Sequence, residues 1–310
     1  MLEPPDLDPK AVRRQFARRA PTAERADFLQ REIEQRMLGR LDLVKLNPAT
    51  IVDVGCGRGL GLLALKQRYP AARLVGIDAA PAVAQRARQT LAPPSKGFLA
   101  KLRAAAGAKG PGSEPALVAA ADAHALPLPA SVAGLVWSNL ALHWFGDPLQ
   151  AIAEWQRIIR PGGLLGFSFF GVDTFMELRR LGARLMPFHD MHDIGDALVH
   201  AGFADPVLDT ERLTLEWRTP DALLEDLSAL GGNALRGRFR GLLGRGQRAD
   251  WLAALATLRE ADGRLRLSVE VAYGHAWCPD RKRLPEGLAP VEFVPRRRPG
   301  PSPGTTAAAP

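Results

Sequence analysis

The stretch that most constrains the fold of this chain is residues 50–59, TIVDVGCGRG, followed by LGLLALKQRY. An apolar run ends at Asp53 and opens into three alternate glycines, Gly55, Gly57 and Gly59, before a helical pattern. This order predicts a buried strand, a tight turn and a helix N-terminus. Such a turn can hold a ligand, because glycine lets a bound molecule approach the backbone and the helix start offers N–H groups to an anion.

The spacing of these glycines separates two kinds of cofactor. The dinucleotide fingerprint requires a third glycine three residues after the second, and that position is Leu60. The pattern GxGxG, with an acid two residues before the first glycine, indicates a different ligand. From this stretch alone, a doubly wound domain that binds no ligand stays the alternative.

Four further segments follow at the spacing of alternating strands and helices. They are 73–78 (RLVGID), 117–123 (LVAAADA), 135–140 (LVWSNL) and 160–163 (RPGG), the last leading into the apolar run LLGFSFF. Together with the glycine stretch they resemble the class I S-adenosylmethionine-dependent methyltransferases. The resemblance implies an α/β Rossmann-like fold: a seven-stranded, mostly parallel sheet that ends in an antiparallel strand, with N-terminal and inserted helices.

The resemblance also implies S-adenosylmethionine as the cofactor. The glycine loop would hold its methionine part, Asp78 its ribose hydroxyls, and Asp122 would lie beside its adenine amino group. An anionic acceptor at Asp78 suits two O–H donors. The cofactor-binding residues expected on this basis are Asp53, Gly55, Cys56, Gly57, Gly59, Asp78, Ala79, Asp122, Ala123 and Asn139.

A more specific resemblance lies in SNLALHW at 138–144, DTFMELR at 173–179 and PFHDMHDIGDALVHAGFADPVLD at 187–209. These segments resemble the malonyl-acyl-carrier-protein O-methyltransferases of biotin synthesis, and the likeness covers about residues 11–276. That family masks the free carboxylate of a malonyl thioester as a methyl ester, so an acyl carrier protein is the implied partner.

A complex I assembly factor with similar motifs is regarded as a protein-arginine hydroxylase, so the motifs alone do not fix the reaction. The alternatives are methylation of another small carboxylate or a lipid, arginine hydroxylation, and a non-catalytic assembly role.

Methyl transfer to a carboxylate needs no general base, since a group with a pKa near 4 is ionised at pH 7. A dry site that positions the oxygen would supply most of the rate. Arg179 is the candidate cation for the malonyl carboxylate, and a surface ion pair with Glu177 is its alternative. His143 is the other catalytic candidate, with packing as its alternative. The expected substrate contacts are Phe16, His143, Trp144, Arg179 and Phe188.

The segment at 189–193 contains two histidines and two aspartates that could suggest a metal site. Their spacing fits no standard zinc pattern, and the segment is more typical of a capped helix start. We therefore expect no metal.

The pattern predicts four regions. Residues 1–44 form an N-terminal helical lid with two amphipathic helices, and 45–280 the methyltransferase domain. Within it, the Gly- and Pro-rich stretch 93–115 is a flexible insertion. Residues 281–310 are a basic, Pro-rich tail that we expect to be disordered. The family usually has a tyrosine after the first helix, where this chain has Thr22 and Ala23.

Two alternating segments, 206–217 and 264–277, predict the final antiparallel strand pair, with helices at 220–230 and 248–261 between them. The linker at 231–248 places five arginines among glycines. It could dock the acidic helix of a carrier protein, or it could be a solvated loop. These residues are Arg236, Arg238, Arg240, Arg245 and Arg248.

Lys and Arg number 41 against 33 acids, which gives a net charge of +8 and favours an anionic partner. Nothing in the pattern provides base stacking or groove readout, so nucleic acid is not expected. No apolar run has membrane-spanning length, so no membrane partner is expected either. Two cysteines form neither a disulfide framework nor a metal cluster, which favours a cytoplasmic location.

Overall fold

The computed structural model describes residues 7–21, 24, 27–92, 115–232, 234–238 and 244–280. Residues 1–279 form one compact unit, and every contact discussed below lies within it. The expectations for the insertion, for Thr22 and Ala23, for Arg240 and for the tail fall outside the described residues. Among the described helices, none combines the length and the apolar character that crossing a membrane would require.

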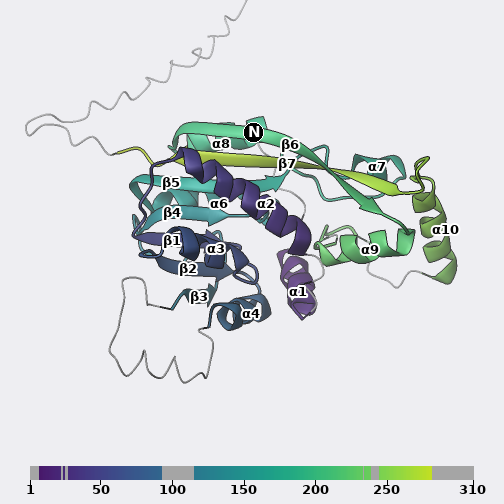
Figure 1. Ribbon diagram of the computed structural model, residues 1–310, viewed down its shortest axis with the longest axis horizontal. Coiled ribbons are helices and arrows are strands. Elements are labelled where there is room, and N and C mark those ends of the chain that lie inside the picture. The colour runs from purple at the N-terminus through teal and green to yellow at the C-terminus, as the bar shows by residue number, and fades with distance from the viewer. Residues whose placement is uncertain are drawn as a thin grey trace, which may run out of the picture. The chain divides into compact units, whose positions relative to one another are not determined.

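Seven strands form one sheet in the order β3-β2-β1-β4-β5-β7-β6 (Figure 1). Strands β1 to β5 pair in parallel, whereas β7 runs antiparallel to both β5 and β6. This confirms the predicted fold, including the final antiparallel pair. The strands are β1 (Thr50–Val54), β2 (Arg73–Asp78), β3 (Leu117–Ala120), β4 (Ala133–Ser138), β5 (Ile159–Phe170), β6 (Ala204–Trp217) and β7 (Leu265–Trp277).

The segments 117–123 and 135–140 extend past the ends of β3 and β4, and local hydrogen bonds give the reason. After β3 the chain turns at Asp122, whose carboxylate accepts the backbone N–H of His124 at 3.0 Å. After β4 the chain turns at Leu140, which has a φ of 50° and donates its N–H to Ser168 Oγ at 3.0 Å. Both turns lie at the carboxyl ends of parallel strands, where ligands bind in open α/β sheets.

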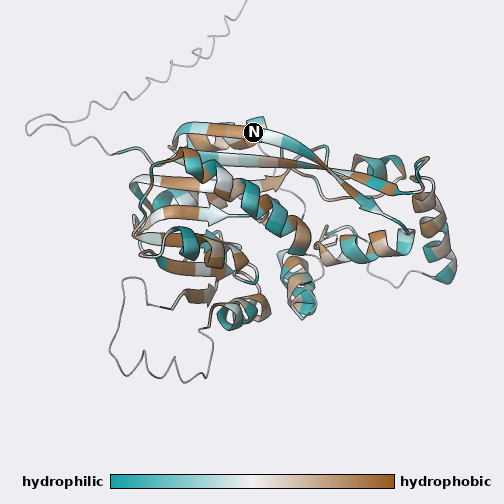
Figure 2. Cartoon of the chain, in the orientation of Figure 1, coloured by the Kyte–Doolittle hydropathy of each residue, from teal (hydrophilic) through white to brown (hydrophobic). Residues whose placement is uncertain are grey.

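Helices cover both faces of the sheet. Helices α2 (Asp27–Arg40) and α3 (Leu60–Arg68) pack on one face, and α6 (Pro148–Ile158) and α8 (Met191–His200) on the other. Along β1, Ile51 belongs to the hydrophobic core that includes α2 and α3, whereas Val52 and Val54 belong to the core that includes α6 and α8. Hydrophobic residues accordingly run along the central strands in Figure 2, as expected for a parallel sheet buried on both sides.

Four of the described helices begin at a side chain that accepts a backbone N–H of the first turn. Asp8 caps α1 (Pro9–Arg19), Asp147 caps α6, Asp190 caps α8 and Thr219 caps α9 (Pro220–Ala229). Such caps stabilise a helix by about 1 kcal/mol each. The Asp190 cap confirms that the His- and Asp-rich segment is a helix start.

The remaining helices in the described part of the chain are α4 (Pro81–Leu91), α7 (Met176–Arg180) and α10 (Arg245–Ala256), with single turns at Leu41–Leu43 and Leu142–Trp144. Helix α10 starts and ends earlier than predicted. Gly244 donates its N–H to Gln247 Oε1 at 3.1 Å, which fixes the start. The Thr257 hydroxyl donates to the carbonyl of Ala254 at 2.6 Å just after the last turn.

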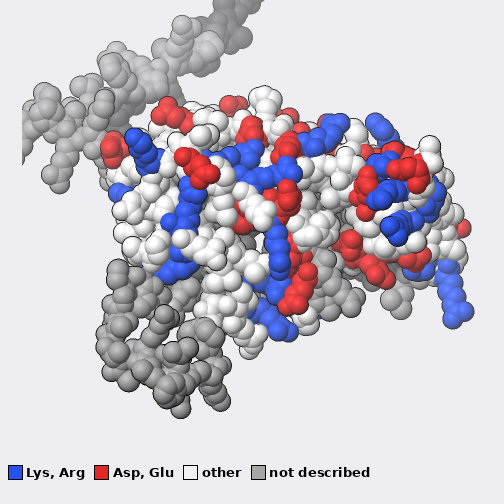
Figure 3. Space-filling view, viewed as in Figure 1, with Lys and Arg blue, Asp and Glu red and all other residues white. Residues whose placement is uncertain are grey.

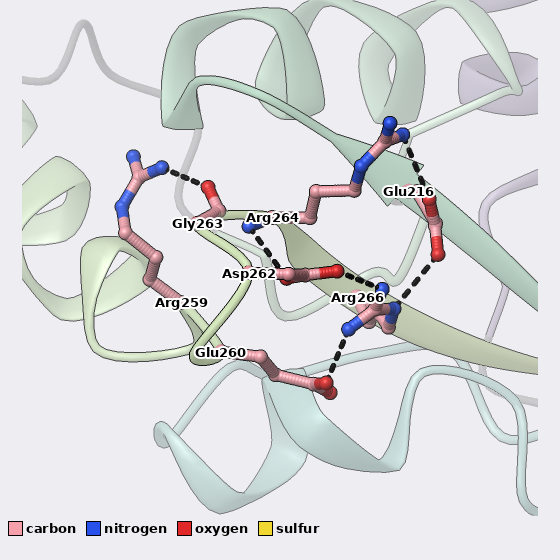
Figure 4. A network of polar contacts seen from close by, with 7 residues as sticks. All are labelled: Glu216, Arg259, Glu260, Asp262, Gly263, Arg264 and Arg266. Carbon is pink, nitrogen blue, oxygen red and sulfur yellow. Dashed lines mark hydrogen bonds and ion pairs between the residues drawn. The ribbon is translucent and has the colours of Figure 1, made fainter.

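Strands β6 and β7 run past the parallel strands toward α9 and α10 (Figure 1). At the end of β6 and the start of β7, Arg266 contacts the carboxylates of Glu216, Glu260 and Asp262 (Figure 4). Charges of both signs are mixed over this end of the visible surface (Figure 3). Exposed pairs of this kind contribute little individually, but a shared arginine links the two strand ends to the turn between α10 and β7.

Candidate active site

The glycine loop after β1 follows a left-handed backbone path, with φ of 80° at Gly55, 53° at Gly57 and 80° at Gly59. A Cβ at Gly55 would lie 2.4 Å from the Cβ of Ala141, and one at Gly59 would lie 3.0 Å from Leu91 Cδ1. A Cβ at Gly57 would meet no atom within 4 Å. Packing therefore excludes a side chain at Gly55, whereas one at Gly59 would require Leu91 to shift slightly and Gly57 faces open space.

A cavity of about 420 Å³ lies between this loop and helix α2. Five of the predicted cofactor residues line it: Asp53, Gly55, Cys56, Gly57 and Asn139. A second cavity of about 60 Å³ is lined by Gly55 and by four more predicted residues, Asp78, Ala79, Asp122 and Ala123. The tenth predicted residue, Gly59, is the N-cap of α3 and lines neither cavity.

A buried carboxyl pair stands at the larger cavity. Asp53 is 3% exposed and Glu34, on α2, is 8% exposed. Burial raises the pKa of Glu34 to about 7, although Trp137 Nε1 and Asn139 Nδ2 donate to its two oxygens at 2.9 and 2.8 Å. Burial also raises the pKa of Asp53 well above its ordinary value, and the nearby carboxyl of Glu34 raises it further.

A third carboxyl, Asp78, ends strand β2 beside the same loop. Its oxygens accept the backbone N–H groups of Gly57 at 3.2 Å and Ala80 at 2.9 Å. Burial nevertheless raises the pKa of Asp78 to about 6. Three carboxyls therefore surround the loop, those of Asp53 and Glu34 buried and that of Asp78 half-buried. Loss of hydration is the largest cause that shifts all three toward the neutral form.

This donor set fits S-adenosylmethionine. Carboxyls with raised pKa values become more acidic beside a cation, and the cofactor has two, an ammonium and a sulfonium. Its ribose hydroxyls are the kind of donor that Asp78 would accept. The open space at Gly57 leaves room for it against the backbone.

Asp122 is held by the ring of His124. Asp122 Oδ1 lies 2.6 Å from His124 Nδ1, and His124 Nε2 accepts the backbone N–H of Asp147 at 3.2 Å. Because Nε2 accepts, Nδ1 carries the proton of the neutral ring and donates to Asp122. Burial raises the pKa of Asp122, but the two hydrogen bonds from His124 outweigh it, so the pKa is lowered overall.

Helix α2 provides site residues that the sequence reasoning missed. Gln30, Glu34 and Leu38 recur every fourth residue and all line the larger cavity. Arg58 of the glycine loop pairs with Asp27 at the start of α2 and with Glu24 at 2.7 Å. The signal in the sequence was an acid, Glu34, directly after the apolar Ile33 in a helix predicted to be amphipathic.

Phe16 and Trp144, two of the predicted substrate residues, lie at the cavities. Phe16 lines the larger cavity and Trp144 the smaller one. Their rings are 5.0 Å apart and perpendicular, a favourable edge-to-face arrangement.

His143 and Phe188 lie behind these rings and line neither cavity. His143 is fully buried and stacks on Phe170 at 4.6 Å, and its Nδ1 accepts the Phe170 N–H at 3.3 Å. Phe188 meets the His143 ring edge-on at 5.8 Å. Burial, with a smaller contribution from the neighbouring His189, lowers the pKa of His143 to about 3, so the ring is neutral. These contacts describe a packing residue.

Arg179 also lines neither cavity. Its side chain is exposed, its guanidinium donates to the carbonyl of Val172, and it lies 5.9 Å from the ring centre of Phe188. The arginine that α1 brings to the larger cavity is Arg19, which donates to Ser228 Oγ at 3.3 Å. Burial lowers the pKa of Arg19, and the neighbouring Arg18 adds to this.

Two glycines that follow α9 lie close to side chains of the site. A Cβ at Gly231 would lie 2.2 Å from Trp144 Cζ2, and one at Gly232 would lie 2.9 Å from Arg19 Nη2. The segment between β6 and β7 therefore touches the side chains that line the cavities, although it lies outside the parallel part of the sheet.

The family model of a methyltransferase domain matches residues 52–167. A malonyl-[acyl-carrier protein] O-methyltransferase from Methylovorus sp. (strain MP688) is 43% identical over 298 residues, covering 94% of this chain and 96% of the relative. One of the same name from Laribacter hongkongensis (strain HLHK9) is 43% identical over 298 residues, covering 93% and 96%. The chain belongs to the malonyl-[acyl-carrier protein] O-methyltransferase family. Membership identifies it as an S-adenosylmethionine-dependent methyltransferase.

A solved structure, the YcgJ protein from Bacillus subtilis, superposes with a TM-score of 0.54 at 13% identity. It covers 79% of this chain and 99% of its own length, and it supports the fold alone. The general domain match leaves out α1, α2 and the β6–β7 segment. The two relatives match more than nine tenths of the chain, so their similarity extends well beyond this domain.

Proposed function

We propose that this chain transfers the methyl group of S-adenosylmethionine to the free carboxylate of a malonyl thioester held on an acyl carrier protein. The product would be a malonyl methyl ester, formed at an early step of biotin synthesis. The observation that carries the proposal is 43% identity to enzymes of that name over nearly the full length of both chains. The cytoplasmic location stays a prediction.

Bound S-adenosylmethionine supplies a methyl group on a positively charged sulfur. The chain would hold the cofactor with Asp78 at its ribose hydroxyls, Asp122 at the adenine side and the loop of Gly55 and Gly57 against its amino-acid part. Glu34 would add negative charge from α2, and it is already hydrogen-bonded in place.

The acyl carboxylate needs a cation and a dry surrounding. We assign the cation to Arg19, because it lines the larger cavity and a half-buried guanidinium can orient a carboxylate. Phe16 and Trp144 would exclude water, which strengthens the attraction between the charges. A general base is not required, since the carboxylate is already ionised. The neutral, buried His143 therefore has no role as a base in this proposal.

Full-length similarity to carboxylate methyltransferases favours this reaction over methylation of a lipid, arginine hydroxylation or a purely structural role. The test is incubation of the purified protein with malonyl-acyl carrier protein and methyl-labelled cofactor. We expect the label as a base-labile ester on the malonyl group. Acetyl-acyl carrier protein, which lacks the free carboxylate, is the control and should stay unlabelled. Cofactor binding without transfer to any malonyl thioester would overturn the proposal.

A further inference from the structure

Helix α1 is strongly basic. Its eleven residues, PKAVRRQFARR, contain no acid and five cations: Lys10, Arg13, Arg14, Arg18 and Arg19. The preceding cap, Asp8, places a carboxylate near this helix start, and its distance to Arg14 is 3.9 Å. Within the described residues, Lys10 and Arg18 form no ion pair.

The two sides of α1 differ in what they face. Val12 lines the smaller cavity, and Phe16 and Arg19 line the larger. The exposed cations Lys10, Arg14 and Arg18 are spaced four apart, so they form one stripe along the helix. We call these three residues the α1 stripe. One side of helix α1 therefore lines the cavities, and the opposite side exposes the stripe to solvent.

The stripe belongs to a firmly placed helix. Asp8 accepts the N–H groups of Lys10 and Ala11 at 3.0 and 3.1 Å, which fixes the start of α1. Near its end, Phe16 and Ala20 pack with Ala80 and Val83 at the start of α4. Like charges four residues apart repel by a few tenths of a kcal/mol per pair, and an acidic partner would remove this repulsion.

Three of the five arginines in the 231–248 linker bind other parts of the fold instead. Arg236 donates to the carbonyl of Leu7 at 3.0 Å, and Arg238 donates to that of Leu235 at 2.8 Å. Arg248 pairs with Asp221 at 2.6 Å. The cations of the α1 stripe therefore have fewer partners within the described residues than these linker arginines have. The stripe also lies on a helix whose other side lines both cavities.

We propose that the α1 stripe is the docking surface for the acidic face of the carrier protein that delivers the malonyl thioester. The inference rests on the proposed function. A thioester on a tethered arm must reach a cavity while its carrier stays outside, so the carrier must dock beside the opening. A helix with a cationic outer side and a cavity-lining inner side meets both needs, and charge complementarity would speed the encounter.

The experiment compares two substrates that share the malonyl thioester: malonyl-acyl carrier protein and malonyl-pantetheine, which has no acidic protein surface. The test variant is Lys10→Glu/Arg14→Glu/Arg18→Glu. The matched control, Lys45→Glu/Arg160→Glu/Arg218→Glu, makes the same charge change at exposed residues that line neither cavity and lie outside the 231–248 linker. A neutral variant, Lys10→Gln/Arg14→Gln/Arg18→Gln, keeps the test valid if charge reversal prevents folding.

We expect the test variant to raise the KM for the carrier substrate about tenfold at low salt, and to leave malonyl-pantetheine kinetics within about twofold of wild type. The neutral variant should show a smaller rise, and the control none. Wild-type KM should increase with salt, and this dependence should be weaker in the test variant. A carrier KM unchanged in both stripe variants would overturn the docking proposal alone. If neither substrate is methylated by wild type, the proposed function fails as well.

Discussion

The indole N–H of Trp137 in β4 donates a 2.9 Å hydrogen bond to the carboxyl of Glu34 in α2. The two residues are 103 positions apart, and their contact fixes α2 over the carboxyl ends of β1 and β4. Glu34 is consequently buried with a pKa of about 7. Its charge state therefore changes near neutral pH.

The first prediction concerns stability without cofactor. Because the folded-state pKa of Glu34 is raised from 4.5 to about 7, the folded state retains a proton that the unfolded chain releases. This contribution is fully present below pH 4.5 and is lost as the pH rises to about 7, by on the order of 3 kcal/mol. In Glu34→Gln that loss should be absent. Urea unfolding should show that, as the pH rises across this range, the free energy of unfolding of the variant increases relative to that of wild type. A difference between the two that does not change with pH would contradict the assignment.

The second prediction concerns the charge of the cofactor. Ionised Glu34 should favour S-adenosylmethionine over its demethylated product, whose sulfur is neutral. Glu34→Gln should reduce that preference about fivefold, as expected for a charge interaction of about 1 kcal/mol. In wild type the preference should fall as the pH drops below 7. Calorimetry with both ligands measures the ratio, and an equal loss for both would mean that Glu34 does not sense the sulfur.

The third prediction separates two glycines of one loop. A Cβ at Gly57 would meet no protein atom within 4 Å, but it would stand in the cavity. Gly57→Ala should therefore cost about 1 kcal/mol of stability for the left-handed backbone and lower cofactor affinity at least about tenfold. Gly55→Ala, whose Cβ would lie 2.4 Å from that of Ala141, should lose several kcal/mol of stability. Thermal melts with and without cofactor distinguish the two, and a Gly57→Ala variant that binds normally would contradict the cavity assignment.

The parts of the fold that depend on local pattern were predictable. The glycine loop, the apolar strands and the final antiparallel pair each carry their signal within a few residues, and the sheet confirms them. Glu34 was missed because its partner, Trp137, is remote in sequence, and no local period connects an acid on one helix to an indole on a central strand.

Arg179 shows a second limit of sequence reasoning. Its segment does follow β5, as predicted. However, Phe175 has a φ of 56° and donates its N–H to the carbonyl of Ser268 in β7 at 2.8 Å. This contact between distant segments turns the short helix α7 so that the Arg179 side chain returns to Val172. A motif fixes the order of residues, but the direction of a side chain depends on such long-range contacts.

The fourth prediction concerns acid sensitivity through His143. Its folded-state pKa is lowered from 6.5 to about 3, so the unfolded chain binds a proton that the folded protein excludes. Stability from this residue is present above pH 6.5 and is lost as the pH falls toward 3, by on the order of 5 kcal/mol. His143→Gln keeps an acceptor for the Phe170 N–H but cannot titrate in this way. Its unfolding free energy should fall less than that of wild type on acidification, and parallel curves would contradict the buried neutral state.

The last prediction tests which arginine binds the acyl carboxylate. Arg19 lines the larger cavity, whereas Arg179 lies at the surface and donates to Val172. Removing a charge-assisted hydrogen bond costs about 1.5–3 kcal/mol, so Arg19→Gln should lower kcat/KM for malonyl-pantetheine by roughly 10- to 100-fold. Arg19→Lys should recover part of the loss, because it restores the charge without the fork.

The matched control for this test is Arg179→Gln, which should stay within about twofold of wild type. Cofactor affinity, measured by calorimetry, should be similar in all three variants, so that a lower rate is attributable to the acyl substrate. If Arg179→Gln loses the activity and Arg19→Gln retains it, the carboxylate must bind beside Phe188, and the α7 segment would have to move from its contact with β7 for the reaction to occur.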